Sequence, residues 1–183
     1  MKAKISKCVF LDRDGTIIED GEYVVDIAKL VLKPDAIDCL KKLQNEGFLL
    51  VIITNQSGVA RGYFTEAEVV KFNDYLVELL HKNGVNINAV YYCPHMLGGV
   101  VEGYNVDCDC RKPKIGMFMR AVNEFNVDLS KSFAIGDKTR DLSICGENGC
   151  RGFLIDSDGE NTEYVTVVNS LTDCVRIITG ENL

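Results

Sequence analysis

Proline is scarce in this chain, and long hydrophobic runs are absent from it. Only 3 prolines stand beside 16 glycines among 183 residues, and no Ser/Gly-rich or Gln/Asn-rich tract occurs, which argues against disorder and flexible linkers. The longest apolar stretch, 48–53, has about six residues, whereas a transmembrane helix needs roughly twenty. We therefore expect one globular domain over residues 1–183, with no membrane span and no internal repeat.

Positive charge is also in short supply, since 20 Lys and Arg stand against 27 Asp and Glu, a formal net charge of −7. This balance repels nucleic-acid backbones and anionic lipids, so we expect neither as a partner. The N-terminal apolar run is too short for a secretory signal, and 8 cysteines are too sparse for a disulfide-stapled scaffold. We expect a cytoplasmic monomer, in which any site for an anion must gather its positive charge locally.

Short apolar runs alternate with amphipathic stretches along the chain. Strands are predicted at 8–11, 48–53, 89–92, 133–135, 153–155 and, more weakly, 164–168. Helices are predicted at 34–46, 65–84, 115–125, 170–178 and from just after Asp137 to about 148. The alternation predicts an α/β fold with a Rossmann-like, mostly parallel sheet and helices on both faces. Ligands of such sheets bind beyond the carboxyl ends of the strands.

Polar residues directly follow three of these predicted strands: Asp12 and Asp14, Thr54 and Asn55, and Asp137 and Asp141. Any one aspartate alone is best explained as a loop or cap residue, but the carboxyl ends of parallel strands share one edge of the sheet. Crowded carboxylates repel one another unless a cation offsets their charge, and a set of oxygen ligands favours Mg²⁺. A partly hydrated Mg²⁺ in turn invites a phosphate.

Two of these aspartates suit phosphoryl transfer. The Asp12 carboxylate needs no deprotonation near neutral pH and can attack phosphorus to form an acyl phosphate. Asp14, two residues further along, faces the same way if the turn stays extended. It can then donate a proton to the leaving alcohol and later accept one from water.

A second cluster of chemically active side chains lies at about 93–110. Cys93 and His95 form one i, i+2 pair, and Cys108 and Cys110 form another. On extended backbone the two side chains of each pair point the same way, so the two pairs together can bind a single ion. Three thiolates and an imidazole fit Zn²⁺, and a site with all four positions filled by protein is structural. Unrelated buried thiols are the alternative, but this loop is polar and glycine-rich. The remaining cysteines are expected to be small core residues, and His81 a solvated side chain near a helix end.

Four motifs now resemble one known family. The segments FLDRDGT, ITNQSG, CRKPK and IGDKTRDL occur in this order at predicted strand ends, from residue 8 to about 142. Together they resemble the four motifs of the haloacid dehalogenase superfamily of phosphotransferases. The resemblance implies that Asp12 is the nucleophile and Asp14 the general acid/base. It also implies that Thr54 and Asn55 bind the phosphoryl group and that Lys112 balances its charge.

The same resemblance implies the metal ligands and the substrate contacts. Mg²⁺ would be held by Asp12, the Asp14 carbonyl, Asp137 and the Lys138 carbonyl. The substrate-binding residues would be Arg13, Asp20, Gly21, Glu22, Tyr23, Asn55, Gln56, Ser57 and Arg111. No large insertion follows the first or second motif, so no separate cap domain is expected, and the zinc loop would cover part of the site.

Two branches of this superfamily carry the paired Cys-x-His and Cys-x-Cys, namely the heptose bisphosphate phosphatases and the histidinol-phosphate phosphatases. NQSGVARGYFTEAEV and the long loop between YYCPH and CDCRKPKIGM resemble the heptose branch. That branch implies a phosphosugar substrate, Mg²⁺ chemistry, a structural zinc and a role in surface-glycan biosynthesis. Histidinol-phosphate phosphatase activity is the alternative, and a non-catalytic zinc-stabilised binding module is a second one.

Overall fold

The structure is a computed structural model that describes residues 5–21, 23–146, 149–155 and 158–181. Its centre is a six-stranded sheet in the order β3-β2-β1-β4-β5-β6, with every neighbouring pair parallel. The strands are β1 (Cys8–Leu11), β2 (Leu49–Asn55), β3 (Ala89–Cys93), β4 (Phe133–Gly136), β5 (Arg151–Ile155) and β6 (Val165–Val168). The predicted α/β class is confirmed.

Helices connect these strands. The α-helices are α1 (Ala36–Asn45), α2 (Glu66–Lys82), α3 (Gly116–Phe125) and α4 (Leu171–Thr179), and the 3-10 helices are η1 (Ile27–Lys29), η2 (Leu129–Lys131) and η3 (Thr139–Leu142). Thr65 caps α2 through a reciprocal capping box with Glu68, which fixes where this helix begins. Of the helices in the described ranges, none is long and apolar enough to cross a membrane.

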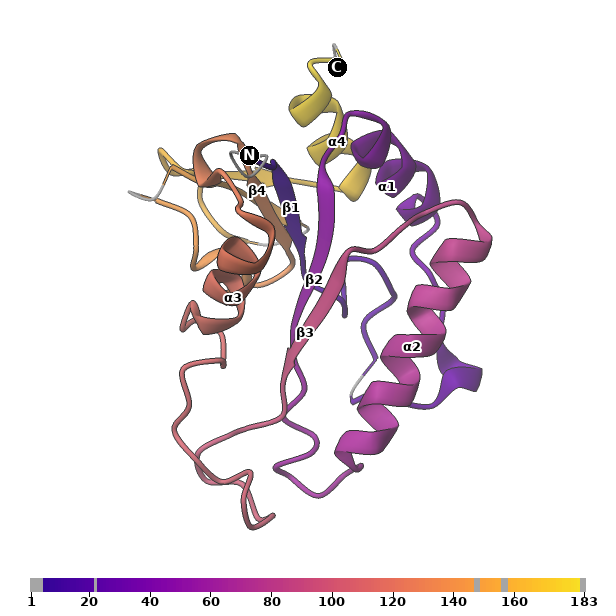
Figure 1. The fold of residues 1–183 in the computed structure, drawn as a ribbon, viewed down its shortest axis with the longest axis vertical. Coiled ribbons are helices and arrows are strands. Elements are labelled where there is room, and N and C mark those ends of the chain that lie inside the picture. The colour runs from indigo at the N-terminus through magenta and orange to yellow at the C-terminus, as the bar shows by residue number, and fades with distance from the viewer. Residues whose placement is uncertain (1–4, 22, 147–148, 156–157, 182–183) are drawn as a thin grey trace.

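Both faces of the sheet are covered, as Figure 1 shows. Along β1, Val9 and Leu11 face a core that includes residues of α1, α2 and α4. Cys8 and Phe10 point the other way, into a second core that α3 helps to build. Both sets are fully buried, as expected for a parallel strand covered on its two faces.

The helix predicted from after Asp137 to about 148 is wrong. The structure has only the short 3-10 helix η3 there, and residues 147 and 148 lie outside the described residues. The Asp141 side chain turns back to accept a hydrogen bond from the Lys138 backbone N–H at 2.9 Å. The Cys145 backbone N–H then donates to the Leu142 carbonyl, three residues earlier. Such i to i−3 bonds form tight 3-10 turns in place of a regular α-helix.

The strand order places the site. β2 lies on one side of β1 and β4 on the other, so the chain changes direction across β1. The crevice beyond the carboxyl ends of such strands is where open α/β sheets bind ligands. Asp12, Thr54 and Asp137 all lie at this edge.

Candidate active site

The turn after β1 brings two strand ends into contact. The Asp12 backbone N–H donates to the Ile135 carbonyl of β4 at 2.9 Å, so the turn starts tied to the neighbouring strand. Gly15 has φ +79°, and a Cβ built there would lie 2.6 Å from an oxygen of Asp137. Glycine is therefore required twice, for its backbone angle and for the close approach of that carboxylate.

Lys112 is the charge centre of this edge. Its ammonium donates to Asp12 Oδ1 at 2.6 Å and to the Ile53 carbonyl at 2.6 Å, and lies 2.7 Å from Asp141 Oδ1. The Lys112 side chain is 1% exposed, and these three acceptors match the three protons of an ammonium group. The ammonium is thus fixed between two carboxylates.

Burial and charge act on this cluster in opposite directions. Burial raises the pKa of Asp12 to about 7; Lys112 lowers that pKa, while Asp141 and Asp14 raise it further. Burial lowers the pKa of Lys112, but Asp12 and Asp141 outweigh it, so this pKa lies above its ordinary value. The lysine therefore stays charged. The ionised form of Asp12 would be stabilised by a further cation nearby.

Asn55 holds the Lys112 backbone in register with β2. Its side-chain amide donates to the Lys112 carbonyl at 3.0 Å, and its side-chain oxygen accepts from the Lys112 N–H at 3.0 Å. Asn55 was predicted to bind a phosphoryl group. In the structure, its side chain makes this two-point contact, which positions the lysine, and Asn55 also lines the phosphoryl cavity.

Polar side chains hold the Asp14 carboxylate in place by hydrogen bonds. Arg13, 1% exposed, donates from Nη2 to Asp14 Oδ1 at 3.0 Å and from Nη1 to Asn73 of α2 at 2.8 Å. Gln56 donates to Asp14 Oδ2 at 2.8 Å, and the Thr54 hydroxyl lies 3.5 Å from the same oxygen. Arg13 and Gln56 were predicted to bind substrate; in the structure they orient this carboxylate.

Three carboxylates form a candidate metal centre. Oxygens of Asp12, Asp137 and Asp141 lie within 4.8 Å of one another, while oxygens on opposite sides of a Mg²⁺ ion lie about 4.2 Å apart. The donor set is hard and anionic, so it fits Mg²⁺. Lys138 donates from Nζ to Asp137 at 2.6 Å, and its carbonyl, predicted as a ligand, accepts from the Asp141 N–H at 2.9 Å.

The cysteine loop brings its four predicted ligands together. Cys93, Cys108 and Cys110 have sulfurs 3.0–3.5 Å apart, and His95 Nδ1 lies 3.4 Å from the Cys110 sulfur and 3.8 Å from that of Cys93. Sulfurs bound tetrahedrally to one Zn²⁺ lie about 3.8 Å apart. Cys93 at the end of β3 and three residues of the loop that directly follows this strand thus form a four-donor cluster that can hold a metal ion.

This cluster is joined to two cationic residues of the site, because Arg111 and Lys112 directly follow Cys110 in the sequence. Arg111 follows Cys110 of the cluster, and its Nη1 donates to the His95 carbonyl at 3.2 Å. The loop is also fastened to the turn after β2, because the Ala60 carbonyl accepts from Val100 and Val101 at 2.8 and 3.1 Å. A metal in the cluster would therefore help to fix Arg111 and Lys112.

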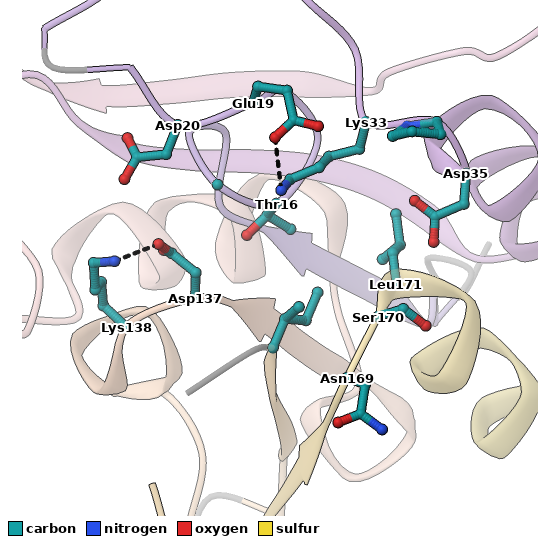
Figure 2. A pocket seen from close by; sticks show the side chains of 13 residues that line it. Thr16, Glu19, Asp20, Lys33, Asp35, Asp137, Lys138, Asn169, Ser170 and Leu171 are labelled. Atoms are coloured by element: carbon teal, nitrogen blue, oxygen red, sulfur yellow. Dashed lines mark hydrogen bonds and ion pairs between the residues drawn. The ribbon is translucent and has the colours of Figure 1, made fainter. Parts of the chain in front are cut away.

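Three cavities meet along this edge. The phosphoryl cavity, about 60 Å³, is bounded by the acidic residues with Thr54, Asn55 and Lys112. The arginine cavity, about 360 Å³, shares Asp14, Asp20, Asn55 and Arg140 with the phosphoryl cavity. It is also lined by Gly21, Tyr23, Gln56, Ser57 and three further arginines, Arg13, Arg61 and Arg111. The lysine cavity, about 390 Å³, includes Thr16, Lys33, Asp35, Ser170 and, shared with the phosphoryl cavity, Asp20, Asp137 and Lys138 (Figure 2).

The predicted substrate loop lies beside the arginine cavity, except for Glu22, which lies outside the described residues. Sequence reasoning missed Arg61, Arg140, Asn73 and the contact of Asp141 with Lys112. Asp141 had a signal, since it follows Asp137 by four residues after a strand. Arg61 and Arg140 had a weaker signal, since they lie within the segments NQSGVARG and IGDKTRDL that follow two strands. Asn73 had none, because only the tertiary fold brings it to this edge.

The fold and the acidic edge define a phosphotransferase of the haloacid dehalogenase class. The sequence model of the family described as polynucleotide kinase 3 phosphatase matches residues 7–156. The chain belongs to this family and is a phosphoric monoester hydrolase.

Relatives and solved structures resemble the chain over nearly its whole length. A D-glycero-beta-D-manno-heptose-1,7-bisphosphate 7-phosphatase of Pasteurella multocida is 44% identical, covering 96% of this chain and 98% of its own. The Escherichia coli O6:H1 protein of the same name is 42% identical, with 96% of each chain covered. The D,D-heptose 1.7-bisphosphate phosphatase from B. bronchiseptica, complexed with magnesium and phosphate, is 29% identical with a TM-score of 0.80, covering 96% and 99%. These findings confirm the resemblance to the heptose branch.

Proposed function

We propose that this protein hydrolyses the 7-phosphate of D-glycero-D-manno-heptose 1,7-bisphosphate and releases heptose 1-phosphate. The observation that carries the proposal is the contact of Lys112 with Asp12 at the end of β1, beside a cavity rich in arginine. The full-length relatives carry this activity in their names. Because they are named for the beta anomer, we propose that anomer as the substrate.

Asp12 is the proposed nucleophile. Its carboxylate oxygen forms a bond to phosphorus while the bond from phosphorus to the C7 oxygen breaks, and Asp14 gives its proton to that oxygen. Asp14 then takes a proton from the water that attacks the aspartyl phosphate, and inorganic phosphate leaves. Arg13 and Gln56 keep Asp14 pointed at the reacting group during both steps.

Charge on the transferring phosphoryl group is offset by Lys112, with Thr54 and Asn55 beside it. We propose that Asp12, Asp137 and the carbonyls of Asp14 and Lys138 hold Mg²⁺. When bound, this ion supplies positive charge against the phosphoryl oxygens. The Lys138 carbonyl would have to share its lone pairs between the ion and the Asp141 N–H.

The remaining predicted residues serve substrate binding and stability. Asp20, Gly21, Tyr23 and Ser57 line the arginine cavity where the sugar would lie, and Arg111 would bind the phosphate on C1 through its planar fork. Cys93, His95, Cys108 and Cys110 would hold a structural Zn²⁺. We propose a single-domain cytoplasmic monomer that acts in the synthesis of nucleotide-activated heptose for surface glycans.

A substrate panel tests this proposal. Phosphate release would be measured with Mg²⁺ for both anomers of the heptose bisphosphate, for histidinol phosphate and for a 3′-phosphorylated oligonucleotide, which the family description suggests. We expect the beta heptose bisphosphate to have the highest kcat/KM. A higher value for histidinol phosphate or for the oligonucleotide would overturn the heptose assignment.

A further inference from the structure

Two cysteines outside the metal cluster lie in contact just after η3. The sulfurs of Cys145 and Cys150 are 3.8 Å apart, and both residues are free thiols. A disulfide bond has an S–S distance of about 2.05 Å, so the two sulfurs need to approach by about 1.8 Å to form one. The pair is therefore close enough to be linked by a local movement of one loop.

The backbone folds back on itself between the two cysteines. Gly146 has φ +122° and Gly149 has φ +86°, angles that favour glycine. The Gly146 N–H donates to the Cys150 carbonyl at 3.2 Å, and the Gly149 N–H donates to the Gly146 carbonyl at 2.9 Å. These hydrogen bonds close the turn, so the two side chains meet because the backbone brings them together.

The two thiols differ in exposure. Cys150 is fully buried, whereas Cys145 is half-buried. A Cβ built at Gly152 of β5 would lie 3.1 Å from the Cys145 sulfur, so a glycine there leaves this sulfur its room. A reagent from solvent can therefore reach Cys145 first, with Cys150 placed behind it as the second thiol.

The environment of Cys150 supports this order of reaction. Its hydrogen-bond contact with Cys145, followed by burial, raises the pKa of the Cys150 thiol above its ordinary value. A thiol with a raised pKa reacts slowly, because the thiolate is the nucleophile. The main cause of the rise is the Cys145 thiol itself, and it is removed once the Cys145 sulfur has formed a mixed disulfide.

We propose that Cys145 and Cys150 form a thiol–disulfide exchange site that takes low-molecular-weight disulfides such as glutathione disulfide. The Cys145 thiolate attacks one sulfur of the reagent, its S–S bond breaks, and one glutathione leaves as a thiolate. The Cys150 thiolate then attacks the Cys145 sulfur and releases the second glutathione. The two cysteines together lose two electrons, the reagent gains them, and the protons of the two protein thiols pass to the two released thiolates.

The pair is connected to the active site through η3. The Cys145 N–H donates to the Leu142 carbonyl at 2.9 Å, and Leu142 packs in the same core as Cys150. The preceding residue, Asp141, lies 2.7 Å from the Lys112 ammonium. Closing the disulfide pulls on the segment that carries Asp141, and small displacements of groups that position a reacting centre lower its rate. We therefore expect the oxidised protein to turn over more slowly.

Peptide mapping tests the covalent step. Arg140 and Arg151 place both cysteines in one tryptic peptide, 141–151. The metal-loaded protein would be treated with glutathione disulfide, alkylated and digested without reduction. We expect this peptide to lack two hydrogen atoms and to carry no alkyl group, and dithiothreitol should reverse both changes. A peptide that stays alkylated at both cysteines, or that stops at a glutathione adduct, would overturn the site.

An activity test examines the connection to η3. Hydrolysis of p-nitrophenyl phosphate is the readout, so failure here leaves the choice of heptose substrate untouched. Oxidation should lower kcat roughly 3- to 10-fold, and dithiothreitol should restore it. Cys145→Ser and Cys150→Ser should keep their kcat after the same treatment. Cys39→Ser, in the core on the other face of the sheet, is the matched control and should still lose activity.

Each remaining outcome contradicts the proposal at a defined step. A disulfide in peptide 141–151 with unchanged kcat would overturn the connection to η3. A loss of activity that persists in folded Cys145→Ser protein would assign the effect to another thiol, and zinc released during the treatment would assign it to the metal cluster. Since Cys145 is half-buried, its serine variant keeps the test available even if Cys150→Ser does not fold.

Discussion

At the scale of single residues, the site depends on a few buried contacts. Lys112 joins Asp12 and Asp141, and Arg13 joins Asp14 and Asn73. Each of the two proposed catalytic carboxylates is thus held by one buried cation. Removing Lys112 would leave the buried carboxylates of Asp12 and Asp141 without their cation, which is more costly than the contacts are stabilising.

Asp12→Asn tests the proposed nucleophile. The amide is a poor nucleophile and a weaker metal ligand, so we expect kcat to fall on the order of 10³-fold or more. Circular dichroism should show that the fold is kept. Asp38→Asn, an exposed aspartate of α1, serves as the control. Turnover of Asp12→Asn within tenfold of the parent would remove Asp12 from the mechanism.

Asn73→Ala tests the support behind Asp14. Asn73 is 4% exposed and accepts the Arg13 hydrogen bond at 2.8 Å, and its loss leaves a buried guanidinium donor unpaired. We expect the free energy of unfolding to fall by about 1–3 kcal/mol, measured by urea denaturation. The exposed Asn45→Ala on α1 should change it by less than about 0.5 kcal/mol. Equal effects of the two variants would show that the Arg13 contact does not stabilise the fold.

At the scale of elements, the sequence predicted the six strands, but β2 continues two residues past the apolar run and includes Thr54 and Asn55. Continuous apolar runs such as 48–53 gave the parallel sheet, and the polar residues after them marked its reactive edge. The segment after β4 was mispredicted because the Asp141 side chain binds the Lys138 backbone, a contact that periodicity does not register. Arg61 and Arg140 converge from different elements, and such convergence depends on tertiary packing.

The cysteine loop gives a prediction at this scale. Purified protein should contain about one Zn²⁺ per chain, and Cys108→Ser should lose it together with several degrees of thermal stability, because a closed structural site contributes folding free energy. Metal content would be measured by elemental analysis. Cys145→Ser, which lies outside the cluster, should keep the zinc. A parent protein without zinc, prepared without chelator, would contradict the structural assignment.

At the scale of the whole molecule, the net charge is negative, whereas four arginines line one cavity at the sheet edge. The net charge of −7 disfavours polyanions at long range, while the cavity attracts a small one locally. The sheet edge therefore selects for compact anions that can enter it. The cysteine loop also contacts this edge, because Arg111 donates a hydrogen bond to the His95 carbonyl.

The pKa of Asp12 predicts how Mg²⁺ binding depends on pH. Burial raises this pKa to about 7 in the metal-free protein, and Mg²⁺ binds the ionised carboxylate. As pH falls below 7, the ion must displace a proton, so its Kd should rise by up to about tenfold per pH unit. Above this pH, the Kd should level off. Calorimetry between pH 5.5 and 8.5 would measure it, and a Kd constant across that range would contradict the raised pKa.

Removal of the 7-phosphate is tested by following heptose 1,7-bisphosphate with phosphorus NMR while the enzyme turns over with Mg²⁺. We expect that the resonance of the phosphate on C7 disappears, that inorganic phosphate appears in equal amount and that the C1 resonance persists. Loss of the C1 phosphate, or no loss of either, would contradict it.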